Sequence, residues 1–320
     1  MRFTKSIFFI LVCLCLSLGV LTTVYGQFPE KPVKIIVPYG PGGISDLTAR
    51  TLSSVISQYL GQPLSVVNKP GGGGVIGGHF MTQGQPGYTM AIFAPVLAFP
   101  EIYRPDAAYT SADIRPVCRQ FMMLTTLFVK KDAPPNNIKE FVEWVKKNPN
   151  MKYGHTGRGA TTHMVGADLA DLVGLNLKDL PFQGDTKVVS AVLGGHIPIG
   201  FANLPGVISH IKAGTVKALG IYADKRIPEA SEVATFAEQG YKLRLPYPFG
   251  GLFVPKASTD QQVEALNRAV GETSKHKSYL KLMGKIGAYV AYMPKSEFEV
   301  ELATYQKVAR EFMKKMGLLK

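Results

Sequence analysis

The strongest constraint on the fold is a repeated alternation of strand-like and helix-like segments. Residues 32–38 are rich in β-branched side chains and are bounded by prolines, which is typical of a strand. A Gly/Pro loop follows, and apolar residues then recur at helical spacing from Leu47 to Leu60, with Ser45 or Asp46 as the expected N-cap. Because strand and helix signals keep alternating, the sequence predicts an α/β fold with mostly parallel sheets.

The alternation continues through most of the chain. Further strand-like segments lie at 64–67, 88–93, 125–129, 151–154, 197–201, 216–221 and 251–254. Helix-like segments lie at 138–147, 162–172, 188–193 and 207–213, and two or three amphipathic helices are expected from residue 259 onward. Ligand sites of α/β folds lie outside the carboxyl ends of the strands, so the loops that follow strands are the places to search.

The first of these loops, residues 38–46, has the composition of an anion site. Glycines such as Gly42 and Gly43 let backbone amides approach a ligand closely. The helix that follows directs its unpaired N–H groups and the positive end of its dipole at the same place. An ordinary tight turn with an N-cap explains the same residues equally well, so this loop alone leaves both interpretations open.

The second loop, residues 154–163, repeats the design of strand, glycines, hydroxyls and helix. Thr161 and Thr162 can donate to a carboxylate or cap the helix, and Arg158 could pair with a carboxylate through two hydrogen bonds. His163 is more often a structural histidine than a ligand group. Two such loops in two halves of the chain favour an anion-binding cleft to which both contribute.

A third glycine-rich stretch, residues 70–77, has the spacing of a dinucleotide fingerprint at Gly72, Gly74 and Gly77. The acidic residue that would bind the ribose is expected about twenty residues later, but residues 95–100 contain neither Asp nor Glu. A nicotinamide-dependent oxidoreductase is therefore an unfavoured alternative, and a structural loop is the preferred interpretation.

The N-terminal 26 residues have the pattern of a secretory signal peptide. Arg2 and Lys5 precede an uncharged apolar run over residues 7–24, and Val24 and Gly26 occupy the small-residue positions of a cleavage site. The sequence thus predicts export to the periplasm with cleavage near Gly26. A retained membrane anchor is the alternative, because the run is nearly long enough to span a bilayer.

Composition and motifs argue against several other functions. The formal net charge is +13, but Lys and Arg are scattered along the chain, which does not favour nucleic acid. Beyond the expected leader Cys118 is the one cysteine, and a buried inert thiol is expected there. The sequence has no common hydrolase, metalloprotease or phosphate-loop motif, and no two of its histidines have zinc-ligand spacing. We therefore expect no catalytic residue, metal or cofactor.

Ordered segments throughout the chain resemble one family. They are 31–38, 41–43 with Asp46, 60–63, 67–71 with Gly77, 86–89, 157–163, 180–184, 193–196, 218–221 and 235–240. The chain resembles the solute receptors of tripartite tricarboxylate transporters, the Bug family, over essentially its whole mature length. Pro86 stands where the family usually has Asp in its "DGYT" turn.

The resemblance implies a two-lobed, type II-like periplasmic binding protein with mixed sheets flanked by helices and a crossing-strand hinge. Lobe 1 would comprise residues 27–125 and 250–320, and lobe 2 residues 126–249. The implied function is a monomeric receptor that binds a small carboxylate and delivers it to a membrane permease; a periplasmic sensor would use the same trap. The implied ligand-binding residues are Tyr39, Gly42, Gly43, Ile44, Ser45, Asp46, Arg158, Ala160, Thr161, Thr162, Gln183 and Gly184.

The chain departs from the family pattern in the expected pocket. Ala160 stands where the family often has Ser, and Arg158 stands where a small or polar residue is usual. Residues 93–98 are apolar and lack a hydroxyl that is often present. One hydroxyl is lost and a guanidinium is gained, so the far end of the pocket is expected to prefer a less polar acid.

Overall fold

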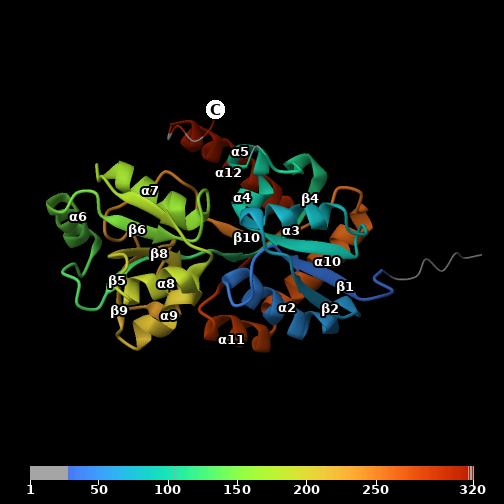
Figure 1. The fold of residues 1–320 in the computed structure, drawn as a ribbon. Coiled ribbons are helices and arrows are strands. Elements are labelled where there is room, and N and C mark those ends of the chain that lie inside the picture. The colour runs from blue at the N-terminus through green and yellow to red at the C-terminus, as the bar shows by residue number, and fades with distance from the viewer. Residues whose placement is uncertain (1–27, 105, 316, 318, 320) are drawn as a thin grey trace, which may run out of the picture.

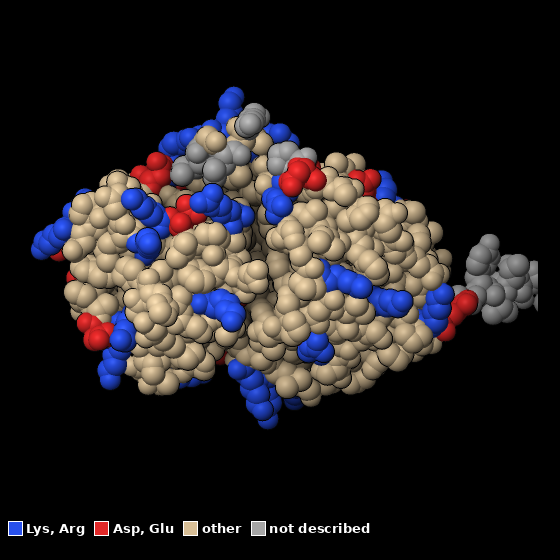
Figure 2. Space-filling view, in the orientation of Figure 1, with Lys and Arg blue, Asp and Glu red and all other residues tan. Residues whose placement is uncertain are grey.

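The computed structural model describes residues 28–104, 106–315, 317 and 319, and the expected signal peptide, residues 1–26, lies outside them. The described chain forms two β-sheets flanked by helices (Figure 1). We call the six-stranded sheet with its helices lobe 1, and the five-stranded sheet with its helices lobe 2. A furrow separates the two lobes on the face shown in Figure 2.

The sheet of lobe 1 has the strand order β11-β4-β10-β3-β1-β2. Its strands are β1 (Val33–Val37), β2 (Leu64–Asn68), β3 (Thr89–Phe93), β4 (Ile114–Met122), β10 (Phe249–Pro255) and β11 (Tyr289–Pro294). The helices of lobe 1 are α2 (Ile44–Leu60), α3 (Val75–Thr82), α4 (Pro95–Ala98), α5 (Pro100–Tyr103), α10 (Asp260–Lys275), α11 (Lys277–Lys285) and α12 (Lys295–Lys315).

The sheet of lobe 2 has the order β7-β6-β8-β5-β9. Its strands are β5 (Thr125–Lys130), β6 (Lys152–His155), β7 (Lys178–Pro181), β8 (Ile199–Asn203) and β9 (Val216–Tyr222). Its helices are α6 (Ile138–Lys147), α7 (Thr161–Leu172), α8 (Asp185–Leu193) and α9 (Leu204–Lys212). Within the described residues, no helix combines the length and apolar character needed to cross a bilayer.

The expectation of mostly parallel sheets is wrong, because both sheets are mixed. β1 pairs in parallel with β2 and β3, and β6 pairs in parallel with β7 and β8. β10 lies antiparallel between β3 and β4, and β5 lies antiparallel between β8 and β9. β5 and β10, the first strand after each crossing between the lobes, run against the other strands that flank them in their sheets. Local alternation of strands and helices does not reveal this reversal.

The chain passes between the lobes twice. The first crossing is short, since β4 ends at Met122 and β5 begins at Thr125, and the return runs from residue 223 to 248. Leu124, between the strands of the first crossing, is buried with Leu204 and Ile208 of α9. The expected lobe boundaries at 125/126 and 249/250 stay a prediction.

The helix α2 shows how the sequence produces these elements. Its apolar residues Leu52, Val55, Ile56 and Leu60 are buried against lobe 1. Full burial of such a side chain contributes about 1.5–3 kcal/mol to folding. Gly61 ends the helix in a left-handed conformation and donates its N–H to the Ser57 carbonyl. In β4, Cys118 is fully buried, as the sequence predicts for an inert thiol.

Candidate ligand-binding site

The loop between β6 and α7 in lobe 2 is held by hydrogen bonds to its own helix. The Thr156 N–H donates to Thr162 Oγ1 (3.0 Å), and the two hydroxyl oxygens lie 2.8 Å apart. Thr162 is fully buried, and these bonds occupy its hydroxyl. Thr161, the first residue of α7, is 5% exposed, and among the described residues its hydroxyl has no hydrogen-bond partner. Of the two threonines, Thr161 is the one whose hydroxyl is available.

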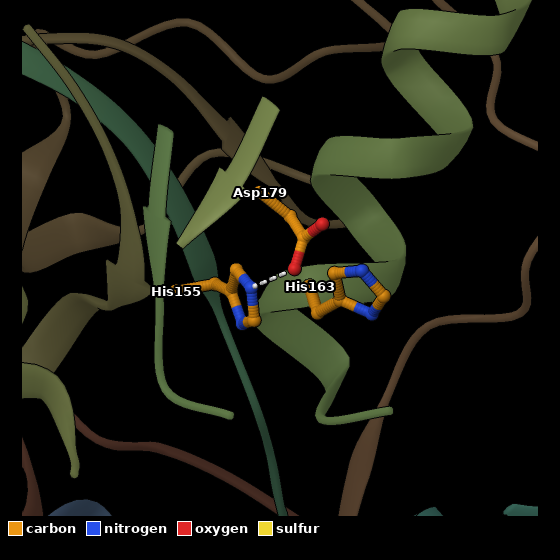
Figure 3. A group of neighbouring side chains, drawn as sticks. All are labelled: His155, His163 and Asp179. Atoms are coloured by element: carbon orange, nitrogen blue, oxygen red, sulfur yellow. Dashed lines mark hydrogen bonds and ion pairs between the residues drawn. The ribbon is translucent and has the colours of Figure 1, made fainter. Parts of the chain in front are cut away.

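Arg158 lies at the outside of this loop. Its side chain is 72% exposed and its Nε donates to Asp179 Oδ2 (3.0 Å). The same carboxylate oxygen lies 3.3 Å from His155 Nε2 (Figure 3). Burial acts to raise the pKa of Asp179, but the hydrogen bonds from His155 and Arg158 outweigh it, so the pKa lies below its usual value. In this structure Arg158 is therefore paired within lobe 2.

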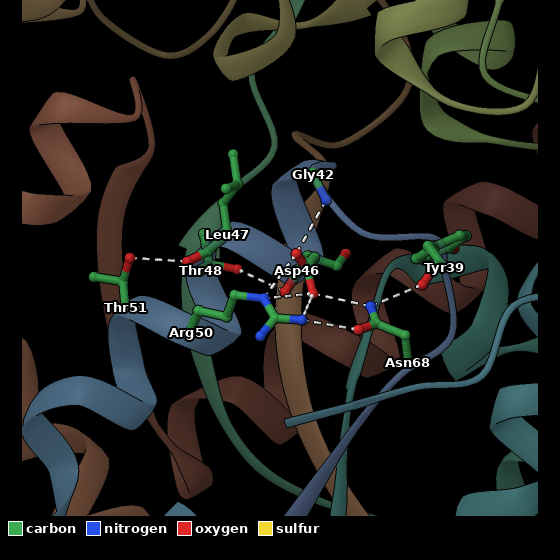
Figure 4. Close-up of polar contacts among 9 residues, drawn as sticks. Tyr39, Gly42, Asp46, Leu47, Thr48, Arg50, Thr51 and Asn68 are labelled. Carbon is green, nitrogen blue, oxygen red and sulfur yellow. Dashed lines mark hydrogen bonds and ion pairs between the residues drawn. The ribbon is translucent and has the colours of Figure 1, made fainter. Parts of the chain in front are cut away.

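The loop before α2 in lobe 1 is organised by a single carboxylate (Figure 4). Asp46 is 2% exposed and accepts hydrogen bonds from the Gly42 N–H (3.0 Å), Asn68 Nδ2 (2.9 Å) and Arg50 Nε (3.0 Å). Burial acts to raise the pKa of Asp46, but hydrogen bonds from these three donors hold it below its usual value. Gly42 has φ +84°, a conformation that favours glycine. Asp46 thus shapes the loop with its carboxylate and has little capacity left for a ligand.

The expected N-cap of α2 is wrong. Ser45 and Asp46 lie inside the first turn, and the helix is preceded by Gly43 in an extended conformation. Asp46 accepts a hydrogen bond from Gly42 upstream instead of capping the helix at its own position. Ser45 is 2% exposed, and its hydroxyl has no partner in the described part of the chain.

The other expected ligand-binding residues of lobe 1 are Ile44 and Tyr39, which lie beside this loop. Ile44 is buried, and Tyr39 is half-buried with its carbonyl accepting from Asn68 Nδ2 (3.1 Å). Burial raises the pKa of the Tyr39 hydroxyl, so this side chain stays a neutral donor. The ring of Tyr39 lies against Gly74, at a position where a Cβ would come within 3.3 Å of it.

The start of α8 is the third helix N-terminus beside the expected ligand-binding residues, and a glycine precedes it. Gly184 has φ +97° and precedes the helix, while Gln183 is exposed. Asp185 accepts from the Asn203 N–H (2.8 Å) and Nδ2 (3.1 Å). Burial raises the pKa of Asp185 to about 6 despite these bonds. The side chain of Asp185 therefore faces Asn203 in lobe 2, and the amide of Gln183 has no hydrogen-bond partner among the residues that the structure describes.

The helices α2, α7 and α8 share the lack of a side-chain cap. Gly43, Ala160 and Gly184 precede them, and none supplies a side-chain hydrogen bond to the first turn. Side chains of Asn137, Thr259 and His276 cap α6, α10 and α11, whereas α3, α4, α5 and α9 also begin without a side-chain cap, so position rather than the missing cap distinguishes the three helices. Unpaired N–H groups at a helix start attract anions. The three helices that contain or adjoin the expected ligand-binding residues therefore keep their donors free.

The first turn of α7 lies at the junction of the lobes. Met164 is 1% exposed and belongs to the same buried cluster as the core of lobe 1.

A separate cavity of about 440 Å³ lies where β4, β11 and α12 meet the return segment, residues 223–248. It is lined by Arg119, Met122, Asp224, Pro246, Tyr247, Tyr289, Ala291 and Glu301, and by none of the expected ligand-binding residues.

The third glycine-rich stretch has a packing role. Arg104 Nη1 donates to the Gly72 carbonyl (2.7 Å). A Cβ at Gly77 would come within 2.7 Å of the backbone of Pro38 and Lys69, so only glycine fits there. The close backbone approach accounts for Gly77 without a dinucleotide.

Sequence reasoning overlooked the partners that hold each loop. Arg50 follows Asp46 by four residues, a spacing that could have indicated the pair. Asn68 reaches the loop because β1 and β2 pair in parallel with Val37 opposite Asn68. Asp179 reaches His155 through a similar register, with Tyr153 opposite Asp179.

Residues 48–318 match the sequence profile of the tripartite tricarboxylate transporter family receptor. The chain belongs to this family. A family member from Cupriavidus necator, described as the UPF0065 protein in the gbd 5' region, is 29% identical over 92% of this chain and 90% of its own length. The resemblance to transporter receptors is confirmed.

Several solved structures share the fold of this chain. One described as a periplasmic transporter has a TM-score of 0.84 and 30% identity, covering 91% of this chain and 99% of its own. The periplasmic binding protein BugD has a TM-score of 0.82 and 28% identity, covering 92% and 100%. Two structures with lower identity show the fold alone: MatC of Rhodopseudomonas palustris with bound malate (24%, TM-score 0.76) and a second R. palustris protein with adipate (22%, TM-score 0.83). The two-lobed fold with mixed sheets is confirmed.

Proposed function

We propose that this receptor binds a small organic carboxylate in the furrow between its lobes and delivers it to a tripartite-type membrane permease. The observation that carries the proposal is the set of uncapped N-termini of α2, α7 and α8, with Met164 bringing the start of α7 to lobe 1. Free N–H groups from both lobes would neutralise a carboxylate without a buried cationic side chain.

Five of the expected residues would contact the ligand, whereas Asp46 and Thr162 hold the two loops in shape. Backbone N–H groups around Gly43 and Ala160 bind carboxylate oxygens from opposite sides. The hydroxyls of Ser45 and Thr161, which have no partner in the described residues, donate to the same group. Gln183, exposed beside Gly184, lines the furrow from lobe 2.

The proposed ligand class is supported by two fold relatives described with malate and adipate. Both ligands carry carboxylate groups, the chemical group that the N–H donors of the two lobes would bind. Lys and Arg side chains are scattered over the face in Figure 2, which would attract anions generally without forming a nucleic-acid groove. We further propose that the protein is an exported periplasmic monomer, in keeping with its leader-like N-terminus and the periplasmic relatives.

A thermal-shift screen of protein beginning at Gln27 tests the proposal. The panel contains mono-, di- and tricarboxylates, aromatic acids and amino acids, with NAD as a control. A carboxylate at about 100-fold its Kd should stabilise the protein by about 2.7 kcal/mol. Small-angle scattering with the active ligand should show compaction as the lobes close. A shift with NAD alone, or none across the panel, would contradict the proposal.

A further inference from the structure

Two histidines and an aspartate meet at the base of the lobe 2 loop (Figure 3). His155 ends β6, His163 lies in the first turn of α7, and Asp179 lies on β7. One ligand atom from each lies within 4.8 Å of the other two. His155 is fully buried, His163 is 8% exposed and the Asp179 side chain is 29% exposed. β6, α7 and β7 therefore bring two imidazole nitrogens and a carboxylate oxygen close together.

We propose that His155, His163 and Asp179 bind a divalent transition metal ion of the zinc type. Two imidazoles and a carboxylate form a common protein ligand set for Zn²⁺, with a fourth position left for water. This proposal is independent of carboxylate transport, because it concerns side chains that the ligand site does not use.

The distances are compatible with this ion. Tetrahedral Zn²⁺ with bonds of about 2.0–2.1 Å places its ligand atoms about 3.3 Å apart. His155 Nε2 and Asp179 Oδ2 are already 3.3 Å apart. A ring nitrogen of His163 has to move by no more than about 1.5 Å to complete the set, which a side-chain rotation with a small loop shift supplies.

The protonation states also suit a metal. Burial lowers the pKa of His155, and burial together with neighbouring His155 lowers the pKa of His163 to about 4. Both rings are thus neutral at neutral pH, and no imidazolium proton has to be displaced. His155 Nδ1 lies 2.9 Å from the Gly157 carbonyl oxygen and 3.2 Å from the Gly157 nitrogen, and without the ion Nε2 is hydrogen-bonded to Asp179. Metal binding through Nε2 therefore requires the tautomer in which Nδ1 carries the proton and donates to the Gly157 carbonyl.

Loading the ion would displace three hydrogen bonds: the one between His155 Nε2 and Asp179 Oδ2, and two from residues 157–159. Arg158 Nε donates to Asp179 Oδ2 (3.0 Å), and the Gly159 N–H donates to His163 Nδ1 (3.1 Å). Because the guanidinium is 72% exposed, it can leave toward solvent. Arg158 therefore competes with the metal for Asp179, and its removal should strengthen metal binding.

The test is calorimetric titration of chelator-treated protein with ZnCl₂, together with Co²⁺ absorption as a readout of tetrahedral geometry. We expect one equivalent in the wild type. His155→Asn and Asp179→Asn should each weaken binding at least about tenfold, whereas Arg158→Ala should tighten it about three- to tenfold. Circular dichroism melts establish folding; Asp179→Asn, at the more exposed position, decides the outcome if His155→Asn does not fold.

Matched controls are the exposed histidines, His79 and His196. His79→Asn and His196→Asn should leave the affinity unchanged. The proposal is overturned if the wild type binds no stoichiometric Zn²⁺, if His155→Asn and Asp179→Asn both keep full affinity, or if Arg158→Ala weakens binding.

Discussion

The loops before α2 and α7 share a local design, but they distribute their charge in opposite ways. In lobe 1 the acid, Asp46, is enclosed, and three donors occupy its carboxylate. In lobe 2 the acid, Asp179, comes from a neighbouring strand, and its cation, Arg158, is largely in solvent. The lobe 1 loop is therefore preorganised by its own contacts, whereas the lobe 2 loop carries a charged group that can be rearranged.

The largest expected effect comes from the two carboxylates. All neighbours of the Asp46 carboxylate are donors, so Asp46→Asn would place an amide NH₂ against another donor. We expect a loss of about 2–4 kcal/mol in unfolding free energy and no measurable carboxylate binding. Asp179→Asn, at a site 29% exposed, should lose less than half as much. Urea unfolding and ligand titration of both variants measure the difference; equal losses would contradict the contrast between the loops.

Asp185, the first residue of α8, is a buried acid for which no cationic partner is found in the described part of the chain. The pKa of Asp185 is raised to about 6, above the usual 3.8, so folding favours its protonated form. The stability that this group contributes is present below about pH 4 and is lost as pH rises through about 6. Asp185→Asn should therefore exceed the wild type in unfolding free energy by about 1–3 kcal/mol near pH 8, and by less near pH 4.

Urea unfolding at these two pH values and near pH 6 measures that prediction. The amide can still accept from Asn203 through its oxygen, so the contact that Asp185 makes is retained in part. A difference between variant and wild type that does not change with pH would show that Asp185 is not the titrating group.

The local design of these loops could be predicted from sequence, and so could the Asp46–Arg50 pair from its spacing, but their partners on neighbouring strands could not. Glycines followed by an amphipathic helix indicated both loops, and the periodicity located α2 and α7 to within a few residues. Asn68 and Asp179 enter through strand pairing, with Val37 opposite Asn68 in one lobe. Such a register depends on the assembled sheet, because the spacing along the chain between a loop and its partner strand carries no signal of contact.

The adjacent residues Thr161 and Thr162 have different expected roles: Thr162 stabilises the loop, and Thr161 contacts the ligand. Thr162→Val removes the acceptor of the Thr156 N–H and should lower the unfolding free energy by about 1–2 kcal/mol. Thr161→Val removes a hydroxyl without a partner in the described residues, so stability should change by less than about 0.5 kcal/mol. Its carboxylate affinity should nevertheless fall about tenfold, since a hydrogen bond to a charged group is lost. Thermal melts and ligand titration would refute the distinction if Thr161→Val were the less stable variant.

The smallest expected effect on stability is that of Arg158. Its ion pair with Asp179 is exposed, and such pairs contribute little, so Arg158→Ala should change the unfolding free energy by no more than about 0.5 kcal/mol. If Arg158 instead turns toward the bound carboxylate, affinity should fall several-fold and its dependence on salt should weaken. Arg158→Lys, which keeps the charge but not the planar fork, should retain the salt dependence and lose part of the affinity. Unchanged affinity in both variants would place the guanidinium outside the ligand site, with its role limited to the ion pair with Asp179 of β7.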